Sequence, residues 1–357
     1  MLAEIIKQEI KERGPIPFRD FMEKCLYYPG LGYYTSPKIQ IGKTGDFYTS
    51  PSVSPVFGAM IAKQLKQMWE IIGSETFTIV EFGAGNGWLC HDILDYFKHH
   101  SEVYDKLDYC IIEKSDVMRT RQQQLLVEKV TWHDGLGELD RIKGCILSNE
   151  LLDNFAVHLV EMGSELMEVF VGYADDFIEV KEPAGAALKQ YLDELNIDLP
   201  QGFRAEINLD ALPWLKELSN CLEDGYVLTI DYGGQSADLY TSRRSRGTLL
   251  CYNNHTINEE PYKNLGLQDI TSHVNFSALM HYGNQYGLQT CGYTEQAHFL
   301  LSLGFKEWLR NSLDKGGDLL EMVRKEAFVS NRLLVDMGSK FKVLIQRKGA
   351  CRDALDG

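Results

Sequence analysis

Residues 78–92, which read Thr-Ile-Val-Glu-Phe-Gly-Ala-Gly-Asn-Gly-Trp-Leu-Cys-His-Asp, constrain the fold of this chain more than any other stretch. The β-branched and aromatic residues at its start predict a short buried strand. Gly83, Gly85 and Gly87 then predict a sharp turn that a ligand can approach without interfering side chains. Trp88 begins a segment with apolar residues at helical spacing, so a helix N-terminus with free N–H groups should point back at the turn.

The spacing of the glycines separates two ligand classes. A dinucleotide fold requires G-x-G-x-x-G, whose third glycine lets the helix pack closely on the strand, and here Trp88 occupies that position. The pattern present is Glu-x-Gly-x-Gly-x-Gly, which resembles motif I of class I S-adenosylmethionine-dependent methyltransferases. Because that ligand carries a sulfonium and an ammonium instead of phosphates, an acidic group beside the turn is tolerated. The predicted cofactor contacts of this segment are Glu81, Gly83, Ala84, Gly85 and Gly87. A glycine turn with only a structural role remains an alternative.

Composition narrows the class of protein. The 357 residues, 44% of them hydrophobic, can bury one large core with an insertion or two ordinary domains. A formal net charge of −15 would repel a phosphate backbone, so we do not expect a nucleic-acid partner. No apolar run approaches about 20 residues, and we therefore expect no membrane insertion.

The cysteines and the N-terminal segment bear on the cellular compartment. The eight cysteines show no C-x-x-C spacing, which favours reduced thiols, and we predict no metal site. The first eleven residues contain Glu4 and Glu9, whereas mitochondrial presequences are poor in acidic residues. On these grounds we predict a cytoplasmic protein.

After the glycine turn, apolar strand-like runs alternate with helical segments. The predicted strands cover residues 109–113, 130–132, 144–148, 226–231 and 341–346. Such alternation predicts an α/β fold, a mostly parallel sheet with helices on both faces. The resemblance of the glycine turn to motif I implies that this fold is the Rossmann-like class I methyltransferase type. Ligands of such sheets bind at the carboxyl ends of the strands, beside the switch in strand order.

Polar residues follow these strands where a nucleoside is expected to bind. Glu113 ends the second strand, where a carboxylate can accept hydrogen bonds from both hydroxyls of a ribose. Asp134 ends the third strand, where we expect the adenine. Gly135 and Asn149, which lie beside the ends of strands three and four, complete the predicted cofactor contacts. A carboxylate at this position is by itself more often a cap of its strand end, but the two carboxylates together with the glycine turn favour a nucleoside site.

The remaining segments suggest additions to this core. Residues 1–75 are predicted to form an N-terminal helical extension and an active-site cover, with Ser54 and Pro55 beginning a long helix. Residues 157–205 are predicted to form an inserted α+β lid with a hairpin and a helix. The predicted core comprises residues 76–156 and 206–349, and residues 350–357 form a C-terminal tail.

Six segments in this order resemble the MidA family of class I methyltransferases, which includes the mitochondrial complex I assembly methyltransferase. The segments are residues 26–34, 45–51, 81–87, 148–155, 231–234 and 269–276. The resemblance implies S-adenosylmethionine as cofactor, S-adenosylhomocysteine as product, and methylation of an arginine on a partner protein. Asn275 and Ala156 depart from the family's usual aspartate and proline.

Three residues are candidates for the chemistry. Glu150 and Asp153 follow the fourth strand at positions i and i+3, so we expect both carboxylates on one face of a helical turn. Two carboxylates that hold one side of a guanidinium would localise its charge and free a lone pair for methylation. His273 is the candidate proton acceptor. Helix capping by the carboxylates and a structural role for His273 remain open.

Other functions are compatible with the same sheet. They are a methyltransferase acting on a small molecule, a cofactor-binding assembly factor without catalysis, and a nicotinamide oxidoreductase. We expect a protein substrate, and the sequence leaves the oligomeric state open.

Overall fold

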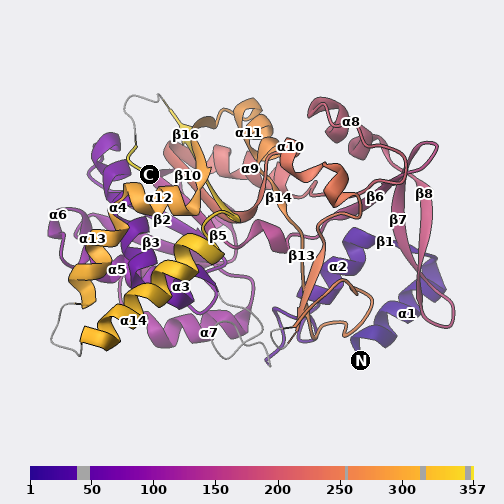
Figure 1. The fold of residues 1–357 in the computed structure, drawn as a ribbon, viewed down its shortest axis with the longest axis horizontal. Coiled ribbons are helices and arrows are strands. Elements are labelled where there is room, and N and C mark those ends of the chain that lie inside the picture. The colour runs from indigo at the N-terminus through magenta and orange to yellow at the C-terminus, as the bar shows by residue number, and fades with distance from the viewer. Residues whose placement is uncertain (38–48, 254–255, 314–318, 350–354) are drawn as a thin grey trace. The chain divides into compact units, whose positions relative to one another are not determined.

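The computed structural model describes residues 1–37, 49–253, 256–313, 319–349 and 355–357 (Figure 1). The Cα positions divide into two units. Unit 1 comprises Met1–Phe47, Leu152–Leu215 and Gly233–Tyr282, and unit 2 comprises Tyr48–Leu151, Lys216–Tyr232 and Gly283–Gly357. The predicted active-site cover, residues 39–54, lies mostly outside the described residues.

Unit 2 contains the sheet that the alternating pattern predicts. Its strand order is β15-β16-β10-β5-β2-β3-β4, which places β2 at the centre of the five parallel strands. The strands are β2 (Phe77–Phe82), β3 (Leu107–Ile112), β4 (Val130–His133), β5 (Ile142–Asn149), β10 (Leu222–Gly234), β15 (Gln289–Glu295) and β16 (Phe341–Lys348). Strands β4, β3, β2, β5 and β10 are parallel, whereas β16 pairs antiparallel with β10 and with β15. The α/β prediction is confirmed, and the strand order reverses between β2 and β5.

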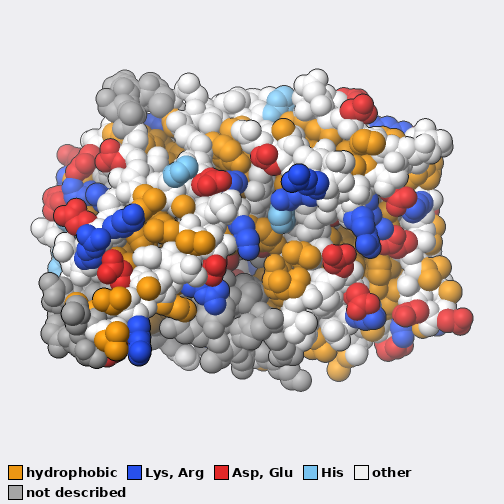
Figure 2. Space-filling view, viewed as in Figure 1, with side chains coloured by type: hydrophobic (Ala, Val, Ile, Leu, Met, Phe, Trp, Pro, Cys, Tyr) orange, Lys and Arg blue, Asp and Glu red, His pale blue; other side chains and the backbone are white. Residues whose placement is uncertain are grey.

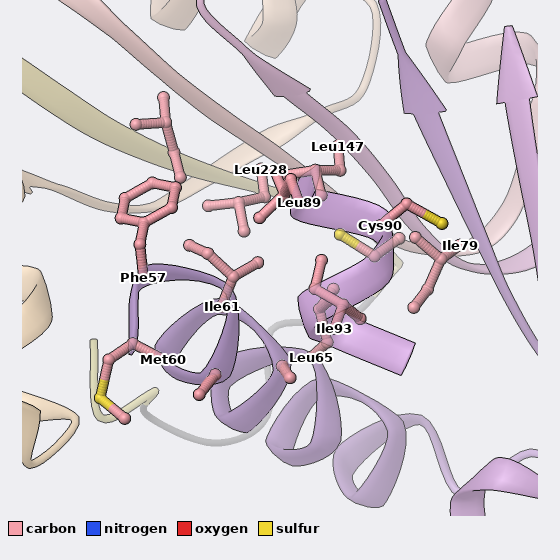
Figure 3. Packing of buried hydrophobic residues seen from close by; sticks show 14 of the residues in the cluster. Phe57, Met60, Ile61, Leu65, Ile79, Leu89, Cys90, Ile93, Leu147 and Leu228 are labelled. Carbon is pink, nitrogen blue, oxygen red and sulfur yellow. The ribbon is translucent and has the colours of Figure 1, made fainter. Parts of the chain in front are cut away.

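Helices α4 (Pro55–Ile72) and α5 (Trp88–Phe97) pack on one face of this sheet. Ser54 caps α4 as predicted, because its side chain accepts a hydrogen bond from the Val56 backbone N–H. Figure 3 shows apolar side chains of both helices gathered against the strands, and those labelled are Phe57, Met60, Ile61, Leu65, Leu89, Cys90, Ile93, Ile79, Leu147 and Leu228. The intervening strand residues Val80 and Ile146 are fully buried as well, so both faces of the sheet are covered.

The other helices of unit 2 flank the strands. They are α3 (Ser50–Val53), α6 (Ser101–Tyr104), α7 (Asp116–Leu125), α12 (Gln296–Ser302), α13 (Phe305–Leu313) and α14 (Leu319–Ser330), with a 3-10 turn at Leu136–Glu138 and a π-helix at Asn331–Asp336. Helices α9 (Ala211–Cys221) and α11 (Phe276–Gln285) begin in unit 1 and end in unit 2.

Unit 1 is built around a five-stranded antiparallel sheet in the order β1-β7-β6-β9, with β8 paired to β7. The strands are β1 (Ile16–Pro17), β6 (His158–Met162), β7 (Leu166–Tyr173), β8 (Phe177–Pro183) and β9 (Arg204–Ile207). The predicted hairpin is present as β6 and β7, and β8 extends it. The helices and turns of this unit are α1 (Leu2–Arg13), α2 (Phe18–Tyr27), α8 (Ala186–Glu194), α10 (Ser236–Leu239) and the 3-10 turns Leu152–Asn154 and Ser242–Arg244.

A smaller sheet in unit 1 has the order β12-β11-β13. Its strands are β11 (Leu250–Asn253), β12 (Thr256–Asn258) and β13 (Asp269–Thr271), and the short β14 (Val274–Asn275) pairs with the end of β10. Unit 1 thus joins residues 1–47 of the predicted N-terminal extension to the predicted insertion, and it also includes residues 233–282 of the predicted core. A lid function for residues 157–205 stays a prediction.

Candidate active site

The glycine turn leads from β2, which lies between β5 and β3, into α5. Gly83, Gly85 and Gly87 all have left-handed backbones, with φ values of 62°, 54° and 83°. The Gly83 N–H donates to the Ile112 carbonyl at 3.0 Å, which ties the turn to β3. A Cβ atom at Gly85 would meet no heavy atom within 4 Å, whereas one at Gly83 would lie 3.0 Å from Leu151 Cδ1. The turn therefore leaves open space at Gly85, where a ligand can approach its backbone.

Glu113 directly follows β3, and its carboxylate is held from two sides. Oε1 accepts from the Ser115 backbone N–H and Oε2 from Gln122 Nε2, both at 2.9 Å. Burial raises the pKa of Glu113, while these donors act in the opposite direction. Since each carboxylate oxygen accepts more than one hydrogen bond, capacity remains for a ribose hydroxyl.

Asp134 and Gly135 lie beyond the end of β4. The Asp134 side chain is 77% exposed and forms an ion pair with Arg119. The same guanidinium donates to the backbone carbonyls of Glu113 at 3.0 Å and His133 at 3.2 Å, so it fastens the ends of β3 and β4 together. Gly135 has an extended backbone and precedes the 3-10 turn. Both predicted contacts thus lie at the expected edge of the sheet.

Glu81 is placed differently from the other predicted cofactor contacts. It lies within β2, is only 3% exposed, and accepts a 2.6 Å hydrogen bond from the Tyr109 hydroxyl on β3. Burial raises the pKa of Glu81 to about 7, and the bond from Tyr109 lowers it in part. Ala84, the other non-glycine contact, is buried.

Asn149 ends β5 next to the switch in strand order, and Glu150 directly follows it. Glu150 Oε1 accepts from the Ser50 backbone N–H at 2.9 Å and from Asn149 Nδ2 at 3.2 Å. Within the described part of the chain, the buried Asn149 Oδ1 atom has no hydrogen-bond partner. An unsatisfied buried acceptor costs free energy, so this atom fits a ligand that donates a hydrogen bond.

The carboxyl group of Glu150 is shielded from solvent and lies near a second carboxylate, that of Asp231. Burial, together with the charge of Asp231, raises the pKa of Glu150 to about 8, and the Ser50 bond partly offsets this. Asp231 is itself 1% exposed and accepts hydrogen bonds from the backbone N–H groups of Leu151 at 3.1 Å and Tyr232 at 2.9 Å. It therefore fixes the chain where Glu150 leaves the sheet.

The predicted helical turn that would carry Glu150 and Asp153 together is not formed. Glu150 has a left-handed backbone with φ 52°, and the 3-10 turn starts only at Leu152. Asp153 belongs to unit 1, where it is 5% exposed and accepts from Asn154 Nδ2 at 3.0 Å. The spacing of i and i+3 places two side chains on one face only when every residue between them is helical.

His273, also in unit 1, accepts a 2.6 Å hydrogen bond from Arg244 at Nδ1. Burial and the Arg244 charge lower the pKa of His273 to about 4, so its ring is neutral at pH 7. A proton taken up by this ring would be disfavoured by the guanidinium beside it.

Gln122 and Asp231 are the residues of this site that the sequence analysis did not single out. Gln122 is fully buried and bridges the glycine turn and Glu113. Its position four residues after Met118, on the buried face of α7, was the available signal.

The surface of the described residues carries charges of both signs. On the face shown in Figure 2, acidic and basic side chains are interspersed. Among the described residues, no cluster of three or more His, Cys, Asp or Glu side chains could hold a metal ion, and no helix could cross a membrane.

The fold and the strand-end site define a class I S-adenosylmethionine-dependent methyltransferase. A family model described as "Putative S-adenosyl-L-methionine-dependent methyltransferase" matches residues 60–294, and the chain belongs to this family. A protein of Burkholderia thailandensis, solved with bound S-adenosyl-homocysteine, is 31% identical, with a TM-score of 0.88 over 99% of this chain and 93% of that one. The resemblance found in the sequence is confirmed.

Curated relatives carry a more specific name. "Protein arginine methyltransferase NDUFAF7, mitochondrial" of Mus musculus is 27% identical over 87% of this chain and 76% of its own length. The homologous protein of Drosophila melanogaster is 25% identical over 99% of this chain and 86% of its own length.

These names contradict the predicted cytoplasmic location, because the curated relatives are mitochondrial. The prediction was wrong because buried thiols are equally compatible with any reducing compartment, and the acidic residues of one short segment are weak evidence of location.

S-adenosylmethionine is the cofactor of the family, and the residues present fit it. The open space at Gly85, the carboxylate of Glu113 and the unsatisfied Asn149 Oδ1 supply the room and the acceptors that its ribose and ammonium groups need. The contacts of the individual residues with the cofactor stay predictions.

Proposed function

We propose that this enzyme methylates an arginine side chain of a partner protein. When bound, the cofactor supplies a methyl group on a positively charged sulfur. The observation that carries the proposal is Glu150, a confined carboxyl group with a pKa of about 8 at the switch in strand order. The names of the curated relatives support the same acceptor.

The chemistry of the acceptor explains why such a carboxyl group is suitable. A guanidinium is permanently protonated at neutral pH, and its nitrogen lone pairs are delocalised. An ionised carboxylate that accepts hydrogen bonds from one side localises the positive charge there, which frees a lone pair on the opposite nitrogen. Glu150 is half protonated near pH 8 in the free enzyme, and an incoming guanidinium would lower its pKa and displace that proton.

Asp153 and His273 take no part in the proposed chemistry. Asp153 accepts a hydrogen bond from Asn154 Nδ2, and the Arg244 guanidinium beside His273 disfavours a proton on its ring. The proton that the methylated arginine releases passes to solvent after the transfer. The chain further uses residues 39–54 and 157–205 to exclude water during transfer.

The test uses S-adenosylmethionine with a deuterated methyl group and protein extract from cells that lack the enzyme. Mass spectrometry should find deuterated methylarginine in a protein, and kcat/KM should rise with pH up to about 8 as Glu150 ionises in the free enzyme. Glu150→Gln should bind S-adenosylhomocysteine normally and lose transfer. The matched control is Glu75→Gln, which changes an exposed carboxylate before β2.

Two results would overturn the arginine assignment. One is full activity of Glu150→Gln, and the other is label found only in small molecules. Replacing the target arginine by lysine should abolish labelling, because an ammonium cannot make the same two-pronged contact.

A further inference from the structure

Gln122 is the only side chain described that joins the glycine turn to the carboxylate of Glu113. Its Nε2 group donates to the Gly85 carbonyl and to Glu113 Oε2, both at 2.9 Å. The two hydrogens of one amide nitrogen thus reach two segments that approach the cofactor from different strands. Both contacts lie within unit 2.

A third contact fixes which way the amide points. The indole N–H of Trp132 on β4 donates to Gln122 Oε1 at 2.9 Å. Because an indole nitrogen can only donate, the atom that faces it must be the oxygen, and the NH₂ group must face Gly85 and Glu113. The sheet therefore sets the direction in which Gln122 donates.

Burying the Gln122 amide costs free energy, which its hydrogen bonds must offset. Gln122 is fully buried on the face of α7 that it shares with Met118, where an apolar residue would ordinarily pack. A buried amide is tolerated only when its donors and acceptor are satisfied, and here all three contacts are made. A Cβ atom at Gly87 would also lie 3.5 Å from Gln122 Cγ, so the side chain packs against the turn.

We propose that Gln122 is a positioning residue, which orients Glu113 and holds the backbone of the glycine turn so that both are preformed for S-adenosylmethionine. Gln122 does not touch the cofactor and acts through these two segments. Loss of its donation leaves Glu113 with one donor fewer and frees the Gly85 carbonyl.

The test measures the affinity for S-adenosylhomocysteine, which binds without being consumed, by titration calorimetry. Gln122→Met keeps the length of the side chain and removes all three hydrogen bonds. Its affinity should be about ten- to a hundredfold weaker, the range expected for a lost bond to a charged group. Gln123→Met is the matched control, since Gln123 lies next along the same helix with its side chain exposed, and its affinity should not change.

The pH profile distinguishes positioning from simple packing. Gln122 is one of the donors that lower the pKa of Glu113, so its removal should raise that pKa further. Protonation of Glu113 should weaken binding as the pH is lowered. In Gln122→Met this loss of affinity should begin at a higher pH than in the wild type. In a Glu113→Gln background, where no carboxylate remains to be oriented, Gln122→Met should weaken binding much less.

Wild-type affinity in Gln122→Met would overturn the proposal, as would an undiminished loss in the Glu113→Gln background. If Gln122→Met does not fold, Trp132→Phe removes the donor that orients the amide and keeps an aromatic ring in its place. A severalfold loss of affinity with a shifted pH profile is expected there, and an unchanged profile would reject the proposal. Because the readout is cofactor binding, the result does not depend on the identity of the acceptor.

Discussion

The pKa of Glu81 predicts a specific dependence of stability on pH. The carboxyl group lies inside β2, and burial raises its pKa from 4.5 to about 7. A raised pKa means that the folded state retains a proton that the unfolded state has released. The stabilisation is complete below pH 4.5 and is lost as pH rises through 7. A shift of about 2.5 units corresponds to about 3 kcal/mol, because each unit is worth about 1.4 kcal/mol.

Glu81→Gln removes the titrating group while preserving its shape. Between about pH 4 and pH 9, the free energy of unfolding of the wild type should fall by about 3 kcal/mol relative to this variant. Urea denaturation followed by tryptophan fluorescence is suitable, since every tryptophan except Trp214 belongs to unit 2. Tyr109→Phe should move the transition to higher pH, because it removes the donor that lowers the pKa of Glu81.

Parallel pH profiles for the wild type and Glu81→Gln would refute this reasoning. Glu75→Gln, an exposed carboxylate just before the same strand, controls for the change in net charge. Calorimetry with S-adenosylhomocysteine on the same variants measures whether Glu81 also contributes to cofactor binding. If Glu81 contacts the cofactor as the sequence predicts, Glu81→Gln should lose affinity at pH 8, where the carboxylate is ionised, and not only change stability.

Three further predictions concern the turn, the sheet and the cover. Gly85→Val should abolish binding of S-adenosylhomocysteine in calorimetry, because a side chain would fill the open space at φ 54°, and binding of NADH alone would contradict the cofactor assignment. Gly144→Ala should strongly lower the melting temperature, since its Cβ would meet the Thr78 carbonyl between β2 and β5, whereas Gly137→Ala, with nothing within 4 Å, should not. Residues 39–54 and 157–205 should exchange amide hydrogens more slowly when cofactor and acceptor are bound, and unchanged exchange in both would exclude a lid.

Strands β2, β3, β5 and β10 could be predicted because each contains an apolar run whose two faces are mostly buried, whereas β4 at the end of the sheet has no buried residue. Strand β15 was missed because its sequence, Gln-Thr-Cys-Gly-Tyr-Thr-Glu, contains small and polar residues and only partly buried positions. Its place in the sheet comes from antiparallel pairing with β16, over a register that shifts between Thr290 and Gly292. Long-range pairing of this kind leaves little trace in local hydrophobicity.

The residues of the candidate site also differ in how far their positions could be predicted from the sequence. The glycines and Glu113 could be predicted because their positions follow directly from the strand and the turn. Gln122 is the first of three consecutive glutamines, and only the packing of α7 decides which of them is buried. The raised pKa values of Glu81 and Glu150 depend on burial by segments distant in sequence, which no local pattern encodes.

Glu150 combines two features that are each unfavourable by themselves. A left-handed backbone is rare for a residue with a long side chain, and a confined carboxyl group is costly to ionise. Both are maintained by specific contacts, since the Glu150 N–H donates to the Ile230 carbonyl at 2.9 Å and its Oε1 accepts from Ser50. Structural roles alone would be met by glycine for the backbone and by an amide for the hydrogen bonds. These two features are consistent with the proposed role of Glu150, in which a negative charge is required when a cationic acceptor arrives.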